Sequence, residues 1–282
     1  MKDGAFGMPL RGAIAAALLL AAAPAGGESA APAAPAYADL ADLALAAPVV
    51  AKVRIGKAVR LDADESPGLD PGRERFYIEA ETVALLRGAG GLPGRVRYLA
   101  DIPRGPEGKA PKPGKKSDYL LFAAPVRGRE GELRLVSPRA HLRWEQRREA
   151  TVRGILQAAL AADAPPVVTG VASAFRSPGA LPGESDTQIF LATREGRPVS
   201  ITVARRAGLP PRWSLALGEL TEGVAPPPVR DTLLWYRLAC ALPPELPPAS
   251  LAAADPDEAA AIAADYRLVL DWLDPCARNW DD

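Results

Sequence analysis

Residues 49–61 read VVAKVRIGKAVRL, and hydrophobic side chains alternate with charged or small ones along the first half of this stretch. Successive side chains of a β-strand point to opposite faces, so such alternation is typical of a half-buried strand. The hydrophobic face would consist of Val49, Ala51, Val53 and Ile55. Lys52 and Arg54 would lie on the opposite face. The stretch therefore predicts one long strand with a single buried face.

The residues that follow predict more strands and then a helix. Aromatic and β-branched residues, bounded by glycine and proline turns, favour strands. The expected strands are residues 75–88, 95–102, 119–124 and 132–136. From residue 145 to 160 the hydrophobic spacing becomes helical. The apolar stripe of this expected helix is Val152, Ile155, Leu156, Ala159 and Leu160.

The second half of the chain begins at Ala164-Pro165-Pro166, which favours a domain boundary. Beyond it, the expected strands are residues 167–175, 187–193, 198–205 and 212–220. Two helices should follow, one from near Asp231 and one with Asp255 as its N-cap and Pro256 at its first position. The sequence thus predicts a mostly β fold with helices, of the α+β class.

The N-terminus has the features of a secretory signal peptide. A short basic region precedes residues 13–23, an apolar stretch that is too short to span a bilayer. Ala23-Pro24-Ala25 forms a cleavage-type triplet, and Ala36-Tyr37-Ala38 forms a less well placed one. We expect a periplasmic or secreted protein without a transmembrane segment after cleavage. The expected organisation is a signal peptide at 1–25, a flexible leader at 26–37, a β domain at 38–163 and an α+β domain at 164–282.

The charges of the chain balance, with 34 basic and 34 acidic residues. No overall positive field therefore attracts nucleic acid, and we expect no nucleic-acid partner. The sequence contains no P-loop and no G-x-G-x-x-G motif, which argues against nucleotide binding. With one histidine and two cysteines, no metal site based on those residues can be built, and we expect no cofactor. A calcium site made only of oxygen ligands stays open.

The two cysteines lie near the ends of the two C-terminal helices. A bridge between Cys240 and Cys276 would tie these helices together. Two free thiols or a redox pair are the alternatives, although the chain has no C-x-x-C motif. We expect a structural disulfide, which the oxidising environment outside the cytoplasm allows.

The only histidine, His141, limits the possible enzyme mechanisms. A hydrolase would need it beside a serine or a carboxylate, and Ser185 and Asp186 are the candidates. Gly183-Glu184-Ser185 lacks the second glycine of the G-x-S-x-G motif. A lone histidine between a strand and a helix is more often a capping or packing residue.

One strand carries a pair of carboxylates. Glu79 and Glu81 lie two residues apart in the expected strand 75–88 and therefore share a face. Paired carboxylates serve glycosidases, but those pairs flank a sugar-sized cleft. A solvated outer face, with Phe76 and Ile78 pointing inward, is the simpler interpretation.

A basic loop is the most distinctive surface feature of the sequence. Residues 103–117 read PRGPEGKAPKPGKKS. The candidate binding residues are Arg104, Lys109, Lys112, Lys115 and Lys116 of this loop, with Arg95 and Arg97 of the preceding strand. If they converge with Arg139, Arg143, Arg147 and Arg148, they would suit phosphate, sulfate or an acidic glycan. A solvated, mobile hairpin tip is the alternative.

Two stretches of the first half resemble a known family. DLADLALAAPVVAKVRIGKAV and KKSDYLLFA followed by GELRLV are similar to the opening helix and strands of OB-like netrin and metalloproteinase-inhibitor modules. The resemblance covers residues 38–160 and implies an antiparallel β-barrel closed by a helix. The N-terminal cysteine with which the inhibitors reach zinc is absent, so protease inhibition is not implied. The whole chain also resembles exported proteins of bacteria whose proteins are rich in alanine and arginine.

Together these features predict a non-catalytic binding or interaction module of the cell envelope. Its partner would be an envelope protein, an anionic glycan or a lipid headgroup. The alternative is a hydrolase that uses His141 with a serine or carboxylate. A third hypothesis is an accessory subunit whose exposed sheet edge pairs with a larger assembly.

Overall fold

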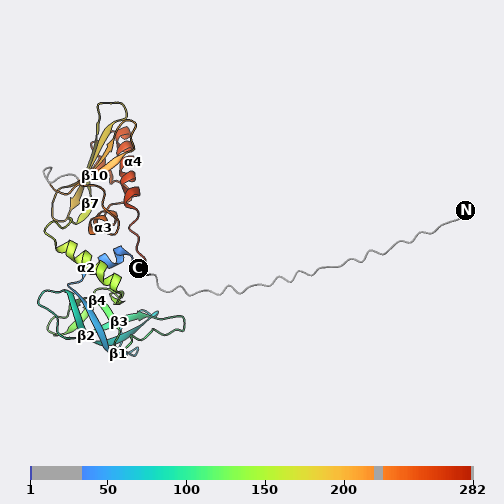
Figure 1. The fold of residues 1–282 in the computed structure, drawn as a ribbon, viewed down its shortest axis with the longest axis vertical. Coiled ribbons are helices and arrows are strands. Elements are labelled where there is room, and N and C mark those ends of the chain that lie inside the picture. Colours follow the sequence, from blue (N-terminus) through green and yellow to red (C-terminus); the bar gives the residue numbers. More distant parts are fainter. Residues whose placement is uncertain (2–33, 219–224, 281–282) are drawn as a thin grey trace. The chain divides into compact units, whose positions relative to one another are not determined.

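The computed structural model describes Met1, residues 34–218 and residues 225–280. The predicted signal peptide and most of the predicted leader lie outside these residues. The described part has the predicted α+β fold, with a closed five-stranded β-barrel and a separate four-stranded antiparallel sheet (Figure 1). The predicted boundary between residues 163 and 164 stays a prediction. No helix of the described part is long and apolar enough to cross a membrane.

The barrel is formed by the strands of the first half. They are β1 (Val49–Arg60), β2 (Arg73–Arg87), β3 (Arg95–Pro103), β4 (Asp118–Pro125) and β5 (Glu132–Leu135). The strand order is β1-β2-β3-β5-β4, and β4 also pairs with β1, which closes the barrel. Only the β3–β5 pairing is parallel among the five. The predicted OB-like barrel is thus confirmed. A short strand that the sequence did not predict, β6 (His141–Arg143), also pairs with β4.

Side chains fill the barrel according to the predicted alternation. Val53, Ile55, Phe76 and Ile78 are buried in its interior core. On the outside of β1 and β4, a second core is covered by two helices, α1 (Tyr37–Ala46) and α2 (Gln146–Leu160). The strand β4 is therefore buried on both faces, which explains its continuous apolar run. The barrel is covered by α2 as predicted.

One residue of the apolar stripe predicted for α2 is exposed instead of buried. Val152, Ile155 and Leu156 are buried as expected, but Leu160 is 73% exposed. Leu160 is the last residue of the helix. Because the packed layer does not extend to this end of the helix, the last position of the stripe has no partner.

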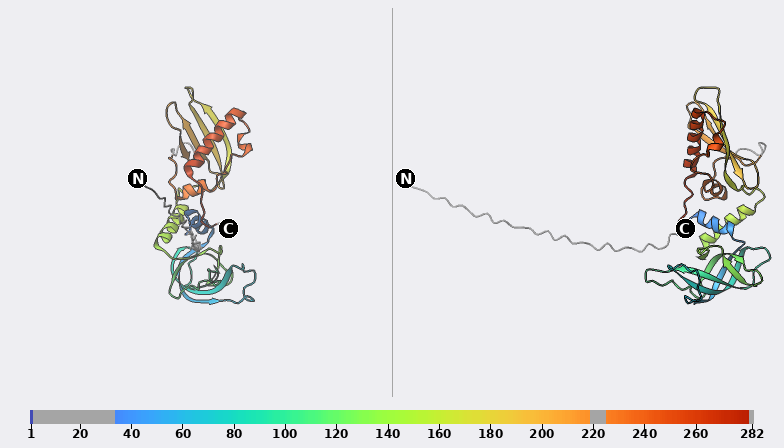
Figure 2. Two further views of the ribbon diagram at one scale, coloured as in Figure 1. Left: turned by 90° about the vertical axis from the view of Figure 1, so that its right-hand side faces the viewer. Right: turned by 180° about the vertical axis from the view of Figure 1, so that it is seen from behind.

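The second sheet has the predicted meander order. Its strands are β7 (Val168–Pro178), β8 (Ser185–Thr193), β9 (Val199–Arg205) and β10 (Arg212–Ala216), in the order β10-β9-β8-β7. One face packs against α3 (Leu233–Ala239) and α4 (Pro256–Leu273). Figure 2 shows α4 lying along this face. A 3-10 helix, η1 (Pro248–Leu251), lies against β7. The side chain of Asp255 caps α4 by accepting a hydrogen bond from the Glu258 amide at 2.9 Å, as predicted.

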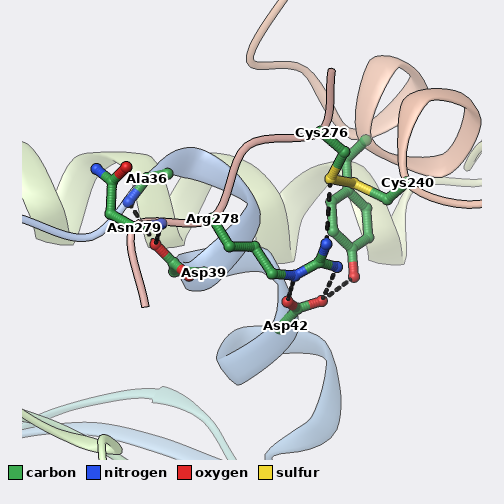
Figure 3. A network of polar contacts seen from close by, with 8 residues as sticks. Ala36, Asp39, Asp42, Cys240, Cys276, Arg278 and Asn279 are labelled. Carbon is green, nitrogen blue, oxygen red and sulfur yellow. Dashed lines mark hydrogen bonds and ion pairs between the residues drawn. A yellow bond between two sulfur atoms is a disulfide. The ribbon is translucent and has the colours of Figure 1, made fainter. Parts of the chain in front are cut away.

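A disulfide joins Cys240 at the end of α3 to Cys276 just after α4, which confirms the predicted bridge. The tail that follows Cys276 contacts α1 (Figure 3). Arg278 pairs with Asp42, and the Asn279 amide donates to the buried Asp39 carboxylate at 3.0 Å. The C-terminal tail is thereby held against the first helix of the barrel half.

Candidate functional site

His141 lies in the short strand β6 and points into the barrel, because it pairs with the inward residue Leu121. Its ring stacks on Tyr119 at 4.1 Å between centroids, and the Tyr98 ring lies 5.6 Å away. Burial lowers the pKa of His141 from 6.5 to about 3. Its Nε2 atom and the Tyr98 hydroxyl are buried without a hydrogen-bond partner in the described part of the chain. This histidine is therefore a neutral ring inside the barrel.

The structure does not bring the proposed triad residues together. Ser185 and Asp186 belong to β8 of the second sheet, whereas His141 belongs to the barrel sheet. The Ser185 hydroxyl is fully buried and accepts a hydrogen bond from Arg176 at 2.9 Å. Asp186 pairs with Arg206. Each candidate thus has a local partner in its own sheet, and these contacts lend no support to the hydrolase alternative.

The pair Glu79 and Glu81 lies on the outer face of β2, as the simpler interpretation predicted. Both residues are exposed, and the residues between and beside them point into the barrel. On β3, Arg97 lies opposite Glu79 and Arg95 lies opposite Glu81. The two carboxylates are therefore members of cross-strand rows of alternating charge.

The three arginines of the predicted basic site lie at opposite ends of β3. Arg95 and Arg97 lie near its beginning, and Arg104 follows its end. Seven residues separate Arg97 from Arg104, which corresponds to roughly 20 Å along a strand. The lysines of the loop, Lys109, Lys112, Lys115 and Lys116, are all exposed. Arg104 therefore lies apart from the two strand arginines, and the convergence of the loop lysines with them stays a prediction.

The middle of the basic loop is fixed to the barrel. The Ala110 amide donates to Oε2 of Glu74 at 3.2 Å, and Ala110 is buried. The same carboxylate pairs with Arg60 at 2.8 Å and with Arg104 at 3.2 Å. One buried carboxylate thus pairs with Arg104, a predicted binding residue, and holds the loop in place.

A groove with a volume of about 640 Å³ lies on the outer side of β2, β3 and β5. Its charged lining is Arg75, Arg97, Asp101, Arg129, Glu132 and Arg134. Tyr77, Leu99 and Val136 are among its hydrophobic lining residues. Leu99 is 45% exposed although it is a large hydrophobic residue in the middle of a strand. The groove therefore combines an accessible apolar floor with guanidinium groups.

Ion pairs within the groove leave one arginine without a carboxylate partner. Arg75 donates to both oxygens of Asp101 at 2.7 and 2.8 Å, and this hydrogen bonding raises the pKa of Arg75. Glu132 pairs with Arg129 at 3.2 Å and with Arg97 at 3.9 Å. Arg134 is exposed and makes no side-chain hydrogen bond or ion pair with another described residue. Four guanidiniums face two carboxylates, so the groove has an excess of positive charge.

No protein-family model and no curated protein matches this chain. Among the described residues, no group of three or more histidine, cysteine or acidic side chains is placed to hold a metal ion. We take the groove as the candidate binding site, because it combines a cavity, an exposed leucine and an excess of arginines.

Of the predicted binding residues, only Arg97 lines this groove. Tyr77, Leu99 and Arg134 were not predicted. Alternation places all three on the outer face of their strands, and that signal was available in the sequence. The pairing of three strands that brings them into one surface could not be read from it.

Proposed function

We propose that this protein is a non-catalytic binding module of the cell envelope that takes an anionic ligand in the groove on β2, β3 and β5. The observation that carries the proposal is the groove itself, where an exposed hydrophobic floor meets an excess of guanidinium groups. Ligand sites commonly combine an apolar surface with a few charged groups that fix orientation. Both carboxylates of the groove are paired with arginines, which favours binding over acid–base chemistry there.

The localisation belongs to the same proposal. A periplasmic or secreted location is supported by the signal-like N-terminus and by the disulfide, because disulfides persist in oxidising compartments. The resemblance of residues 38–160 to netrin and metalloproteinase-inhibitor modules also stays a proposal. An anionic envelope glycan or lipid headgroup is the ligand class that fits the charge of the groove.

The test is a binding measurement with the purified protein carrying its disulfide. The probes are a carboxylated oligosaccharide, a sulfated oligosaccharide and vesicles that contain phosphatidylglycerol, each with a neutral counterpart. We expect at least one anionic probe to bind, with an affinity that falls as salt is added. If no anionic probe binds better than its neutral counterpart, the proposal is wrong.

Matched substitutions locate the site. Leu99→Asp places a negative charge on the floor of the groove and should abolish binding, because the new charge repels the ligand. Val83→Asp places the same charge at a position of β2 that is similarly exposed, at 43%, and lies outside the groove lining. It should leave binding unchanged. A variant with the four loop lysines replaced by glutamine should also bind normally, and loss of binding in that variant alone would assign the site to the basic loop instead.

A further inference from the structure

We infer that the ligand of the groove is an acidic sugar, whose ring lies on Tyr77 and Leu99 and whose carboxylate is bound by Arg134. This inference rests on the proposed function and adds the chemical class of the ligand. It follows from the arrangement of three side chains across three strands, from the free guanidinium of one of them and from the small number of aromatic rings in the groove.

The three residues form one row across the sheet. Tyr77 of β2 lies directly opposite Leu99 of β3. β3 and β5 are parallel, with Arg97 beside Glu132 and Tyr98 beside Leu133. Continued by one residue, this register would place Arg134 beside Leu99, and both residues line the groove. All three point outward, because their chain neighbours Phe76, Ile78, Tyr98, Ala100 and Leu133 are buried in the barrel core.

The spacing of the row suits a short sugar chain. Neighbouring strands lie about 4.8 Å apart, so the row extends over about 10 Å from Tyr77 to Arg134. An aromatic ring and an exposed leucine provide an apolar surface for the C–H face of a pyranose. Arg134, at the end of the row, provides the charged group. A sugar that carries a carboxylate has both an apolar face and a negative charge.

The ion pairs within the groove indicate which arginine is available to bind an anion. Arg75, Arg97 and Arg129 are already paired with Asp101 or Glu132. Arg134 is the lining arginine for which the described residues supply no such partner. A guanidinium binds a carboxylate through two parallel N–H···O bonds, a geometry that an ammonium group cannot provide. A single free guanidinium therefore fits one carboxylate at a time.

Other anionic ligands fit this row less well. Single-stranded nucleic acid needs successive aromatic rings on which bases stack, and here Tyr77 is the aromatic ring on the outer face of the row. An anionic membrane surface is recognised by a cluster of several free lysines or arginines. Because one unpaired arginine stands beside two hydrophobic residues, an acidic sugar is favoured over both.

The experiment is isothermal titration of the disulfide-bonded protein with four probes. They are an oligogalacturonate, its methyl ester, oligo-dT and vesicles containing phosphatidylglycerol. We expect the oligogalacturonate to bind and the methyl ester, which lacks the charge, to bind at least about tenfold more weakly. Arg134→Ala should cause a similar loss, and Arg134→Lys should recover only part of the affinity. Tyr77→Ala should weaken binding of the sugar as well.

Arg95→Ala is the matched control, since Arg95 is an exposed arginine of β3 outside the groove lining. It should leave the affinity for oligogalacturonate unchanged. If Arg134→Ala and Arg95→Ala bind alike, the role of Arg134 is refuted. If oligo-dT or the vesicles bind in a manner sensitive to Leu99→Asp and oligogalacturonate does not, the acidic-sugar inference fails while the proposed function stands. If none of the charged probes binds, both fail.

Discussion

Arg278 in the C-terminal tail donates through Nε to Oδ2 of Asp42 in α1 at 2.7 Å, although 236 residues separate the two in the sequence. The Tyr236 hydroxyl of α3 donates to the other oxygen of the same carboxylate. Burial raises the pKa of the Tyr236 hydroxyl, and the hydrogen bond to Asp42 raises it further. Asp42 thus connects the first helix of the barrel half to both α3 and the tail (Figure 3).

Replacing Asp42 by alanine should destabilise the fold more than the loss of an ordinary surface ion pair. The substitution leaves the partly buried Tyr236 hydroxyl without an acceptor, which costs about 1–3 kcal/mol. Asp186→Ala is the control, because the Asp186–Arg206 pair has similar exposure and no tyrosine. Its expected cost is below about 1 kcal/mol. Urea unfolding of both variants checks this, and equal losses would contradict the role given to Tyr236.

Reducing the Cys240–Cys276 bridge should lower the free energy of unfolding by roughly 4 kcal/mol, because a closed loop restricts the unfolded chain. The tail should also exchange its amide protons faster, since the bridge holds it near α1. Hydrogen exchange of residues 277–279 with and without reductant measures this effect. A variant with both cysteines replaced by serine should not respond to the reductant. Unchanged exchange in the wild-type protein would show that Arg278 and Asn279 hold the tail without the bridge.

The pH dependence of the free energy of unfolding should show that His141 stays neutral in the folded protein. In the folded protein its pKa is about 3, against 6.5 in the unfolded chain. Below pH 6.5 the unfolded state therefore binds a proton that the folded state does not, and stability falls as the pH decreases toward 3. The slope from this residue is about 1.4 kcal/mol per pH unit. His141→Phe, which keeps a ring against Tyr119, should remove that part of the slope between pH 6 and 4, and parallel profiles for both proteins would refute this assignment.

Asp265→Ala should be the most destabilising of the single substitutions. Asp265 is fully buried in α4, accepts from Arg205 Nε at 2.6 Å and also accepts from the buried Thr187 hydroxyl. Removing one partner of a buried pair leaves the others unsatisfied and costs about 3 kcal/mol. Thr187→Val removes only one hydrogen bond and should cost about 1 kcal/mol. Thermal unfolding of the two variants gives the comparison, and an Asp265→Ala cost no larger than that of Thr187→Val would contradict the network.

Asp265 also shows where sequence reasoning was incomplete. Ile262, Tyr266 and Leu273 lie on the inner face of α4, as the helical spacing of hydrophobic residues favours. The same spacing includes Asp265, but a carboxylate on an apolar face is stable only if a partner meets it there. That partner, Arg205, comes from β9, and nothing in the helix sequence indicates it.

For the groove, too, part of the arrangement could be predicted from the sequence and part depends on the tertiary structure. Alternation in each strand correctly assigned the inner face of the barrel, because the side-chain period of a strand is a local property. The free state of Arg134 depends on which of the neighbouring arginines take Asp101 and Glu132. Glu132 meets Arg97 because β3 pairs with β5, and these two strands are not consecutive in the chain.

The sequence by itself determined the five barrel strands, the second sheet, the helices α2, α3 and α4, the α+β class and the pair of cysteines, because periodicity, capping residues and composition act over a few neighbouring residues. The tertiary structure alone decided that Arg104 is paired with Glu74, that His141 is a neutral ring inside the barrel and that Tyr77, Leu99 and Arg134 line one groove. These outcomes depend on strand register and on competition among charges for partners. Both are set by contacts between residues far apart in the chain.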